Sequence, residues 1–111
     1  MGRGCVSVSR KTEGTADVTS GKWKDGRVGV YYGVVKGKGP PMIQIWGTEG
    51  TTESAGPDGY QGLVLAIAAF FHTGRAPVDP AETIEVFEFM TAAQLSKDRG
   101  GAEVPLEELR K

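Results

Sequence analysis

The spacing of the apolar residues changes once along this chain, near Asp58, and this change constrains the fold more than any other feature. Before Asp58, apolar and polar residues alternate with period two in short segments that glycines separate, as in β-strands. After Asp58, apolar residues recur every three or four positions, as in amphipathic helices. A chain of 111 residues holds one domain with a single modest core. We therefore expect one domain over residues 1–111, of the α+β class.

The first half of the chain predicts a mainly antiparallel β-sheet of about five strands. The expected strands are residues 5–9, 18–24, 27–35, 42–46 and 51–54. Asp25-Gly26 predicts a two-residue type I′ hairpin, because glycine adopts positive φ freely and aspartate does so more readily than most residues. In that hairpin, Trp23 and Lys24 pair with Arg27 and Val28.

The strand expected over residues 27–35 has apolar side chains on both faces. Alternation places Val28, Val30, Tyr32 and Val34 on one face, and Gly29, Tyr31, Gly33 and Val35 on the other. Residues 42–46 repeat this pattern. An antiparallel sheet with one face in water shows a cleaner alternation of apolar and polar residues. Because the helices of the second half cover only one face, we expect a neighbour on the other.

Two main helices are expected to pack on one face of the sheet. The first contains the apolar run 63–71, ends at Gly74 and is apolar nearly all round, so it should lie deep against the sheet. The second runs from about Pro80 to Asp98, with Asp79 as its N-cap. Its expected buried stripe is Val86, Phe87, Phe89, Met90 and Ala93, and its expected solvated flank is Glu85 and Glu88. Val104 is a candidate edge strand, and residues 105–109 are a candidate short helix.

Composition and charge exclude several classes of protein. With 13 basic and 14 acidic side chains the net charge is −1, so no overall field draws the chain to nucleic acid or anionic membranes. The longest apolar run, residues 63–71, is far shorter than the ~18 residues that cross a bilayer. No targeting signal is visible at the N-terminus, which favours a cytoplasmic location. Cys5 is the single cysteine and makes no intrachain disulfide, and no cluster of cysteine and histidine is present to hold a metal.

The residues contain no catalytic constellation. His72 is the only imidazole and has no serine, cysteine or carboxylate partner at a motif spacing, so a surface or capping role is expected. Cys5 is expected to be an ordinary thiol. The acidic pairs Glu85/Glu88 and Glu107/Glu108 are typical of solvated helix faces, since acid–base catalysis needs one desolvated carboxyl group in a pair. We therefore expect no catalytic, cofactor-binding or metal site in the chain.

Aromatic and basic residues alternate around the predicted hairpin, a pattern on which single-stranded nucleic acid can stack. The set consists of Lys22, Trp23, Lys24, Arg27, Tyr31, Tyr32, Lys36 and Lys38. Since the net charge is −1, lysines at the rim of an amphipathic sheet are the favoured explanation, and nucleic-acid binding is the less favoured one. The candidates for an oligomer interface or a ligand-facing surface are Trp23, Tyr31, Tyr32 and Trp46, with packing favoured over ligand binding.

Three segments of the chain resemble the C-terminal domain of the Gfo/Idh/MocA oxidoreductases, the glucose-fructose oxidoreductase and inositol dehydrogenase family. These segments are WKDGRVGVYYG, IWGTEGT and FFHTGRAPVDPAETIEVFEFMTAAQLSKDRGG. The turn Gly47-Thr48-Glu49-Gly50 looks like the family's G-T-x-G turn, and residues 77–96 look like its last helix and the entry to that helix. The likeness spans this chain from about Val6 to Leu109, but only the last third or so of a family enzyme.

The resemblance implies a part of an enzyme. Family members bind NAD or NADP through an N-terminal Rossmann domain and use a lysine in an E-K-P motif, and neither feature occurs in this sequence. The implied function is the substrate and oligomerisation domain of an NAD(P)-dependent sugar or cyclitol oxidoreductase, with no cofactor site or catalytic residue of its own. The resemblance also implies a homo-oligomer whose interface is built by strands such as residues 27–35 and 42–46.

A second interpretation stays open. The chain is then a free-standing, non-enzymatic module that dimerises, or that binds a small ligand or single-stranded nucleic acid. An in-frame Rossmann half upstream of Met1 would distinguish the first interpretation from the second.

Overall fold

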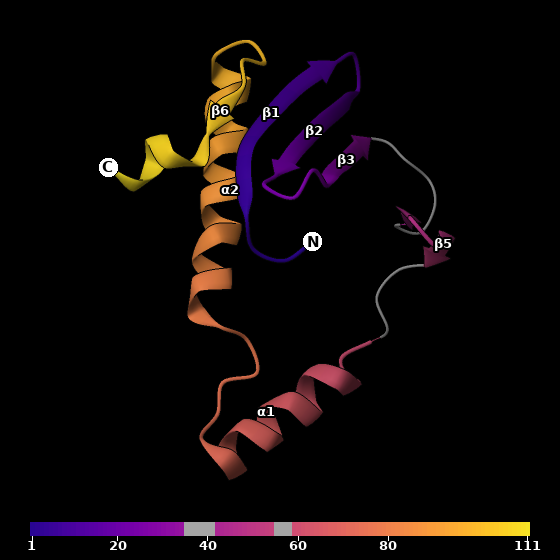
Figure 1. Cartoon of the computed structure of the whole chain (residues 1–111), viewed down its shortest axis with the longest axis vertical. Helices are drawn as coiled ribbons and strands as arrows, with labels where there is room; N and C mark the ends of the chain where they lie inside the picture. The colour runs from indigo at the N-terminus through magenta and orange to yellow at the C-terminus, as the bar shows by residue number, and fades with distance from the viewer. Residues whose placement is uncertain (35–41, 55–58) are drawn as a thin grey trace. The chain divides into compact units, whose positions relative to one another are not determined.

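The computed structural model describes residues 1–34, 42–54 and 59–111, and these residues form two antiparallel β-sheets and two α-helices (Figure 1). The α+β class with mainly antiparallel strands is therefore confirmed. The chain divides into two compact units, one made of residues 1–36 and 78–111 and the other of residues 37–77. The strands expected in one sheet are shared between a four-stranded sheet in the first unit and a hairpin in the second.

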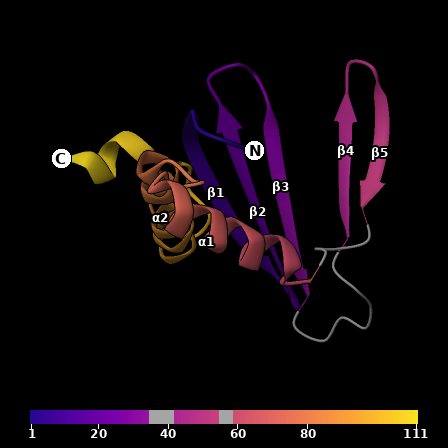
Figure 2. The ribbon, with the colours of Figure 1, turned by 90° about the horizontal axis from the view of Figure 1, so that it is seen from below.

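The first unit is built on a four-stranded sheet with strand order β3-β2-β1-β6, in which every neighbouring pair is antiparallel. Its strands are β1 (Cys5–Glu13), β2 (Ala16–Trp23), β3 (Val28–Val34) and β6 (Val104–Pro105). Figure 2 shows β1, β2 and β3 side by side, with helix α2 (Pro80–Asp98) next to β1. The expected edge strand at Val104 is confirmed, because β6 pairs with Ser7 and Val8 of β1.

Strands β1 and β2 are both longer than expected, because a two-residue turn at Gly14-Thr15 joins them directly. Gly14 has a φ of 61°, and among the described residues only glycines have positive φ. A two-residue turn with positive φ at its first central position alone is of type II′, which matches the twist of the flanking strands.

The prediction of a type I′ hairpin at Asp25-Gly26 is wrong. A type I′ turn needs positive φ at both central residues, and only Gly26 has one, at 87°. The loop instead contains three residues, Lys24 to Gly26. Gly26 N–H donates to Trp23 O at 3.0 Å, and Trp23 N–H donates to Arg27 O at 2.9 Å. The physical reason is the Asp25 carboxylate, which accepts from the Arg27 backbone N–H at 3.2 Å while Asp25 keeps an ordinary negative φ.

Helix α2 begins as expected and packs mainly on β1. The Asp79 carboxylate accepts from the Ala81 N–H at 2.9 Å, and Pro80 occupies the first helical position, where its missing N–H costs nothing. The core of the first unit lies beneath this helix. It consists of Cys5, Val8, Trp23, Ala92, Ala93, Val104 and Leu106, with Phe89, Leu95 and Leu109 packed against them.

The stripe of α2 that faces the sheet differs from the expected one. It consists of Glu85, Phe89, Ala92, Ala93 and Ser96, which are buried or half-buried. Burial of Phe89 and Ala93 is confirmed, but the prediction for Val86, Phe87 and Met90 is wrong, since each is more than half exposed. Close approach to β1 selects small side chains instead of large apolar ones. Ser96 shows this approach, because its hydroxyl accepts from Arg10 N–H at 2.8 Å.

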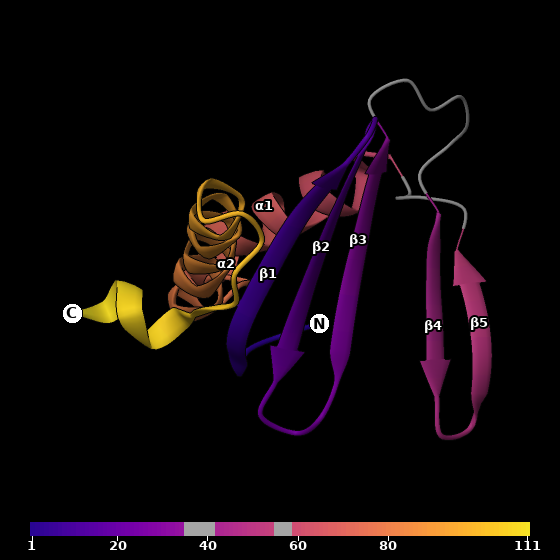
Figure 3. The ribbon, with the colours of Figure 1, turned by 90° about the horizontal axis from the view of Figure 1, so that it is seen from above.

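The chain ends in a short helix, as the sequence predicts. The 3-10 helix η1 (Leu106–Arg110) follows β6, and its first residue, Leu106, is fully buried in the core. Figure 3 shows η1, at the C-terminus, on the β1 side of the sheet and away from β3, and β6 pairs with β1 at that edge. The C-terminal segment thus contributes a strand, the two core residues Val104 and Leu106, and a short helix to the first unit.

The second unit contains a β-hairpin and a helix. Strands β4 (Ile43–Gly47) and β5 (Gly50–Ser54) pair through a turn at Thr48-Glu49, which confirms the strands expected near residues 42–46 and 51–54. Helix α1 (Gln61–Thr73) ends at Gly74, whose φ of 68° confirms the expected C-terminal glycine. The packing of α1 on the sheet stays a prediction, and Val35 lies outside the described residues.

Candidate functional site

Within the first unit, the four-stranded sheet has one face covered by α2 and one open face. Directly paired residues of an antiparallel ladder point to the same face. The ring of Phe89, on α2, lies over Gly21 of β2, and Gly21 pairs with Gly29 of β3. Gly29 and the residues two and four positions further, Tyr31 and Gly33, therefore lie on the helix side. The alternate residues of β3 lie on the open face.

These alternate residues of β3 form an exposed apolar strip. The strip consists of Val28, Val30, Tyr32 and Val34, which are 61%, 64%, 65% and 46% exposed. It contains no charged side chain, and Val18 of β2 pairs with Tyr32 beside it. The face that the sequence predicts for these four residues is confirmed. A contiguous apolar row of this kind is typical of an interaction surface.

The other half of the open face, over β1, is polar. The hydroxyls of Ser9 and Ser20 hydrogen-bond at 2.9 Å. The Ser7 hydroxyl donates to Glu103, which also accepts from Lys22 Nζ at 3.1 Å. The hydrogen bond from Ser7, followed by that from Lys22, lowers the pKa of Glu103 and keeps this carboxylate charged. The open face is therefore apolar along β3 and hydrophilic along β1.

Trp23, one of the four candidate interface or ligand-facing residues, lies in the core. It is 9% exposed, and its Nε1 donates to Gly2 O at 2.9 Å. A Cβ atom at Gly21 would lie 2.9 Å from the Trp23 ring and 2.6 Å from the Phe89 ring, so glycine makes room there for two aromatic side chains. An apolar cavity of about 250 Å³ adjoins Trp23, and its walls include Val86, Phe89 and Met90.

The other three candidates are exposed, and the two that belong to the first unit do not share a face of the sheet. Tyr31 and Tyr32 are neighbours in β3 and point to opposite faces of the sheet. Trp46 is exposed on β4, in the second unit. Of the four, only Tyr32 belongs to the apolar strip.

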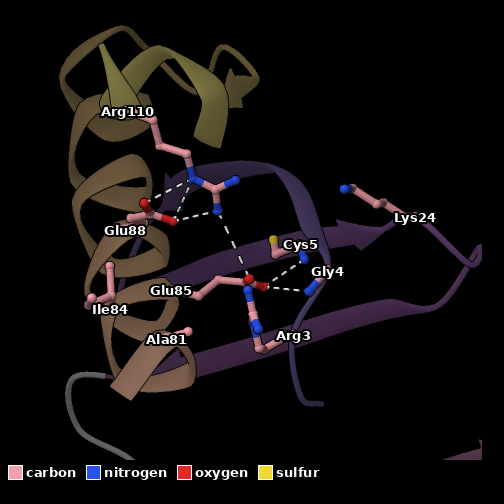
Figure 4. Close-up of a pocket in the computed structure, with 9 residues that line it drawn as sticks. All are labelled: Arg3, Gly4, Cys5, Lys24, Ala81, Ile84, Glu85, Glu88 and Arg110. Carbon is pink, nitrogen blue, oxygen red and sulfur yellow. Dashed lines mark hydrogen bonds and ion pairs between the residues drawn. The ribbon is translucent and has the colours of Figure 1, made fainter. Parts of the chain in front are cut away.

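A charged pocket of about 440 Å³ lies where the N-terminal segment, α2 and the end of η1 meet (Figure 4). Glu85 Oε1 accepts from the backbone N–H groups of Gly4 and Cys5, each at 2.7 Å. Arg110 donates to Glu88 from Nη2 at 2.6 Å and from Nε at 2.9 Å, and its Nη2 lies 3.9 Å from Glu85 Oε2. The prediction that Glu85 and Glu88 form a solvated flank is wrong, because their side chains are only 12% and 17% exposed.

The ionisable groups of this pocket hold the fold together. The Arg110 guanidinium lowers the pKa of Glu88, and Glu88 in turn raises the pKa of Arg110, so both stay charged at neutral pH. Burial, followed by the nearby charge of Glu85, raises the pKa of the Cys5 thiol. A thiol with a raised pKa is protonated at neutral pH and is a poor nucleophile. Cys5 is thus an ordinary thiol, as expected, and the two carboxylates tie the N-terminal segment and η1 to α2.

The basic and aromatic residues considered for nucleic-acid stacking do not form a continuous platform in the described part of the chain. Trp23 is buried, and Tyr31 and Tyr32 lie on opposite faces. Lys22 pairs with Glu103 at 3.1 Å, and the Arg27 guanidinium pairs with Asp25 at 2.7 Å. Lys36 and Lys38 lie outside the described residues.

The remaining candidates belong to different elements. His72 is in the last turn of α1, and Glu108 of η1 accepts from Arg99 at 2.7 Å. Over residues 1–34, 42–54 and 59–111, no three histidine, cysteine, aspartate or glutamate side chains are grouped so as to hold a metal ion. None of the helices in those residues combines the length and apolar character needed to cross a membrane. Comparison with protein-family models, with curated proteins and with solved structures finds no match for this chain.

Proposed function

We propose that this chain is the substrate and oligomerisation part of an NAD(P)-dependent sugar or cyclitol oxidoreductase and is not catalytic by itself. The proposal starts from the resemblance of three segments to the C-terminal domain of the Gfo/Idh/MocA oxidoreductases. Two structural features support it: an antiparallel sheet with a long terminal helix along one face, and a row of apolar side chains on the opposite face.

The apolar strip of β3 is the observation that carries the proposal. Fully burying one valine or similar side chain stabilises a structure by roughly 1.5–3 kcal/mol. With Val28, Val30, Tyr32 and Val34 all exposed in the first unit, several kcal/mol of such stabilisation is unused within that unit. A second copy packed on the open face would bury the strip, and the polar residues over β1 would form the hydrophilic rim that interfaces carry.

In this role the chemistry of the enzyme resides in another part of it. NAD or NADP would be bound by a Rossmann half, whose glycine-rich turn and helix N-terminus hold the pyrophosphate. The half-buried carboxylates of the present chain serve its fold, because Glu85 accepts from backbone N–H groups and Glu88 pairs with Arg110. The contribution of this chain would be to hold two or more copies of the enzyme together.

Size-exclusion chromatography with light scattering tests the assembly. We expect the chain to form a homo-oligomer at tens of micromolar. The double variant Val30→Glu/Tyr32→Glu should be monomeric, because assembly would bury two unpaired carboxylates. Lys11→Glu is the matched control, since it changes the charge on the polar half of the same face and should leave the oligomer intact. A clean monomer of the unmodified chain, or an oligomer that the double variant does not affect, contradicts the proposal.

A free-standing dimerisation module is the second candidate, and the same apolar strip favours it. Light scattering does not separate the two functions, but the gene does. An in-frame Rossmann half upstream of Met1 would support the oxidoreductase, whereas a stop codon directly upstream would support the module.

A further inference from the structure

We propose that the open edge of β3 pairs with β3 of a second copy, antiparallel and in the register that sets Tyr31 opposite Tyr31. This inference rests on the homo-oligomer proposed above and adds to its face-to-face contact a second contact between copies. That second contact is at the backbone edge of β3, which is distinct from the apolar face of the same strand.

One row of backbone groups on β3 points away from the sheet. β3 is the edge strand of the four-stranded sheet in the described part of the chain. The hydrogen bond from Trp23 N–H to Arg27 O shows which row points outward, because bonded and non-bonded pairs alternate along an antiparallel ladder. It follows that Gly29, Tyr31 and Gly33 bond to β2. The residues that direct N–H and C=O groups outward are Val28, Val30, Tyr32 and Val34.

The sequence of β3, Val-Gly-Val-Tyr-Tyr-Gly-Val, is nearly the same in both directions. About the central Tyr31, Val28 corresponds to Val34, Gly29 to Gly33 and Val30 to Tyr32. A two-fold axis at Tyr31 would therefore pair valine with valine, glycine with glycine and valine with tyrosine. An interface between two identical copies must be self-complementary, and this strand meets that requirement.

Hydrogen bonding selects the same register. With Tyr31 opposite Tyr31, the facing pairs Val28/Val34 and Val30/Tyr32 are made of residues whose backbone groups point outward. A shift of the register by one residue would place residues whose backbone groups point outward opposite residues whose groups bond to β2. A shift by two residues would restore the bonding pattern but leave fewer facing residue pairs. The glycines leave room for the tyrosine rings on the helix side. A Cβ atom at Gly33 would lie only 2.8 Å from the Tyr31 ring of the same chain.

The two edges of the sheet differ in their protection against such pairing. Natural edge strands are blocked by short length, charged side chains, proline or bulges. The β6 edge is two residues long and contains Pro105. The β3 edge is seven residues long, has no charge and no proline, and keeps a regular register with β2. Only the β3 edge is thus suited to accept another strand, and its near-symmetric sequence favours a second copy over an unrelated peptide.

Disulfide cross-linking tests the register. In a Cys5→Ala background, Tyr31→Cys should give a disulfide-linked dimer as the main species under mild oxidation. Facing residues of a non-hydrogen-bonded pair have Cα atoms about 4.5 Å apart, within the range that a disulfide spans. Val30→Cys and Tyr32→Cys are matched controls, since each would lie about 8 Å from its symmetry mate, two residues along the strand and beyond disulfide reach.

Hydrogen exchange of the unmodified chain gives a second measurement that needs no substitution. In the oligomer, the amides of Val30 and Tyr32 should be protected, and dilution to the monomer should remove that protection while Tyr31 stays protected. Rapid exchange of Val30 and Tyr32 in the oligomer would overturn the pairing. So would protection that persists in the monomer.

The outcomes separate this inference from the proposed function. An oligomer in which Tyr31→Cys does not cross-link, or cross-links no better than the controls, overturns edge pairing and leaves the homo-oligomer standing. A chain that is monomeric by light scattering overturns both. Selective cross-linking of Tyr31→Cys, together with dilution-sensitive protection, supports edge pairing and the homo-oligomer.

Discussion

At the scale of single residues, Glu85 links more parts of the first unit than any other side chain of the charged pocket. Its Oε1 atom accepts from two successive backbone N–H groups, at Gly4 and Cys5, and its Oε2 atom faces Arg110. Carboxylates that accept from backbone N–H groups form some of the stronger hydrogen bonds in proteins. Glu85 therefore stabilises the entry to β1 and the end of η1 at the same time.

We predict that Glu85→Ala lowers the free energy of unfolding by about 1–3 kcal/mol, because two backbone donors lose their acceptor. Urea denaturation followed by circular dichroism measures the change. Glu13→Ala is the control: it removes an exposed carboxylate from the end of β1 and should change stability by less than about 0.5 kcal/mol. Equal effects of the two substitutions would contradict the role assigned to Glu85.

The pairing of Glu88 with Arg110 predicts a pH dependence. Folding lowers the pKa of Glu88 from its ordinary value of 4.5, because Arg110 donates to the carboxylate. A group with a lower pKa in the folded state adds stability above its unfolded pKa and loses it as the pH falls through the folded value. Glu88→Gln should therefore be less stable than the unmodified chain at neutral pH, and the difference should shrink below about pH 4.5. Urea denaturation of both proteins across this range tests it, and a constant difference would count against the pair.

Residue-level patterns predicted some of these positions and missed others for one physical reason. That one face carries Val28, Val30, Tyr32 and Val34 followed from the alternation of side chains along a strand, which depends only on the strand itself. Glu85 and Glu88 were missed because a carboxylate is normally solvated. The available signal was spacing: Glu85 lies four residues before Phe89 and seven before Ala92, on the stripe that meets β1. To recognise this stripe in the sequence, alanine and serine have to be treated as residues that can pack a helix against a sheet.

At the scale of elements, the fit of α2 against the sheet depends on glycine in β2. The rings of Phe89 and Trp23 both lie over Gly21, which has no side chain to separate them from the backbone. Ala92, Ala93 and Ser96 bring the next turns of α2 close to β1. The packing of this helix is therefore determined by small residues on both elements.

We predict that Gly21→Ala destabilises the first unit by about 1–3 kcal/mol, because the new Cβ would lie 2.6 Å from the Phe89 ring and force it aside. Thermal unfolding followed by circular dichroism measures the loss. Gly62→Ala is the matched control in α1, where a Cβ meets no atom within 4 Å, and alanine should be neutral or stabilise the helix by about 0.5–1 kcal/mol. Tolerance of Gly21→Ala would mean that the helix does not pack as closely as described.

Element boundaries that rest on local chemistry were predictable, and those that rest on tertiary contacts were not. The N-cap Asp79 and the terminating Gly74 followed from the conformations these residues favour. The loop at Lys24 to Gly26 has one residue more than predicted, because the Asp25 side chain bonds within the turn. The buried stripe of α2 was misassigned because the largest apolar residues do not face β1.

At the scale of the whole molecule, alternation identified the strands but not their partition into two sheets. A period of two shows that a segment is a strand and on which side each residue lies, but it does not name the neighbouring strand. The first unit takes residues from both ends of the chain, and residues 37–77 form the second unit between them. The Gly/Pro-rich segments at residues 36–41 and 74–80 coincide with its two boundaries, but such a signal does not distinguish the boundary of a unit from an ordinary loop.

This arrangement has a consequence for the timing of synthesis. Strands β1 to β3 are complete at Val34, whereas the helix residues Ala92 and Ala93 and the core residues Val104 and Leu106 are added later. At about 5–20 residues per second, the ribosome takes roughly 3 to 12 s between Val34 and Ala92. During that interval, any sheet that β1 to β3 form would be uncovered on its helix side and would have an open β3 edge. A chaperone that binds the uncovered strands, or a second nascent chain that contacts them, would therefore have to do so before α2 packs on the sheet.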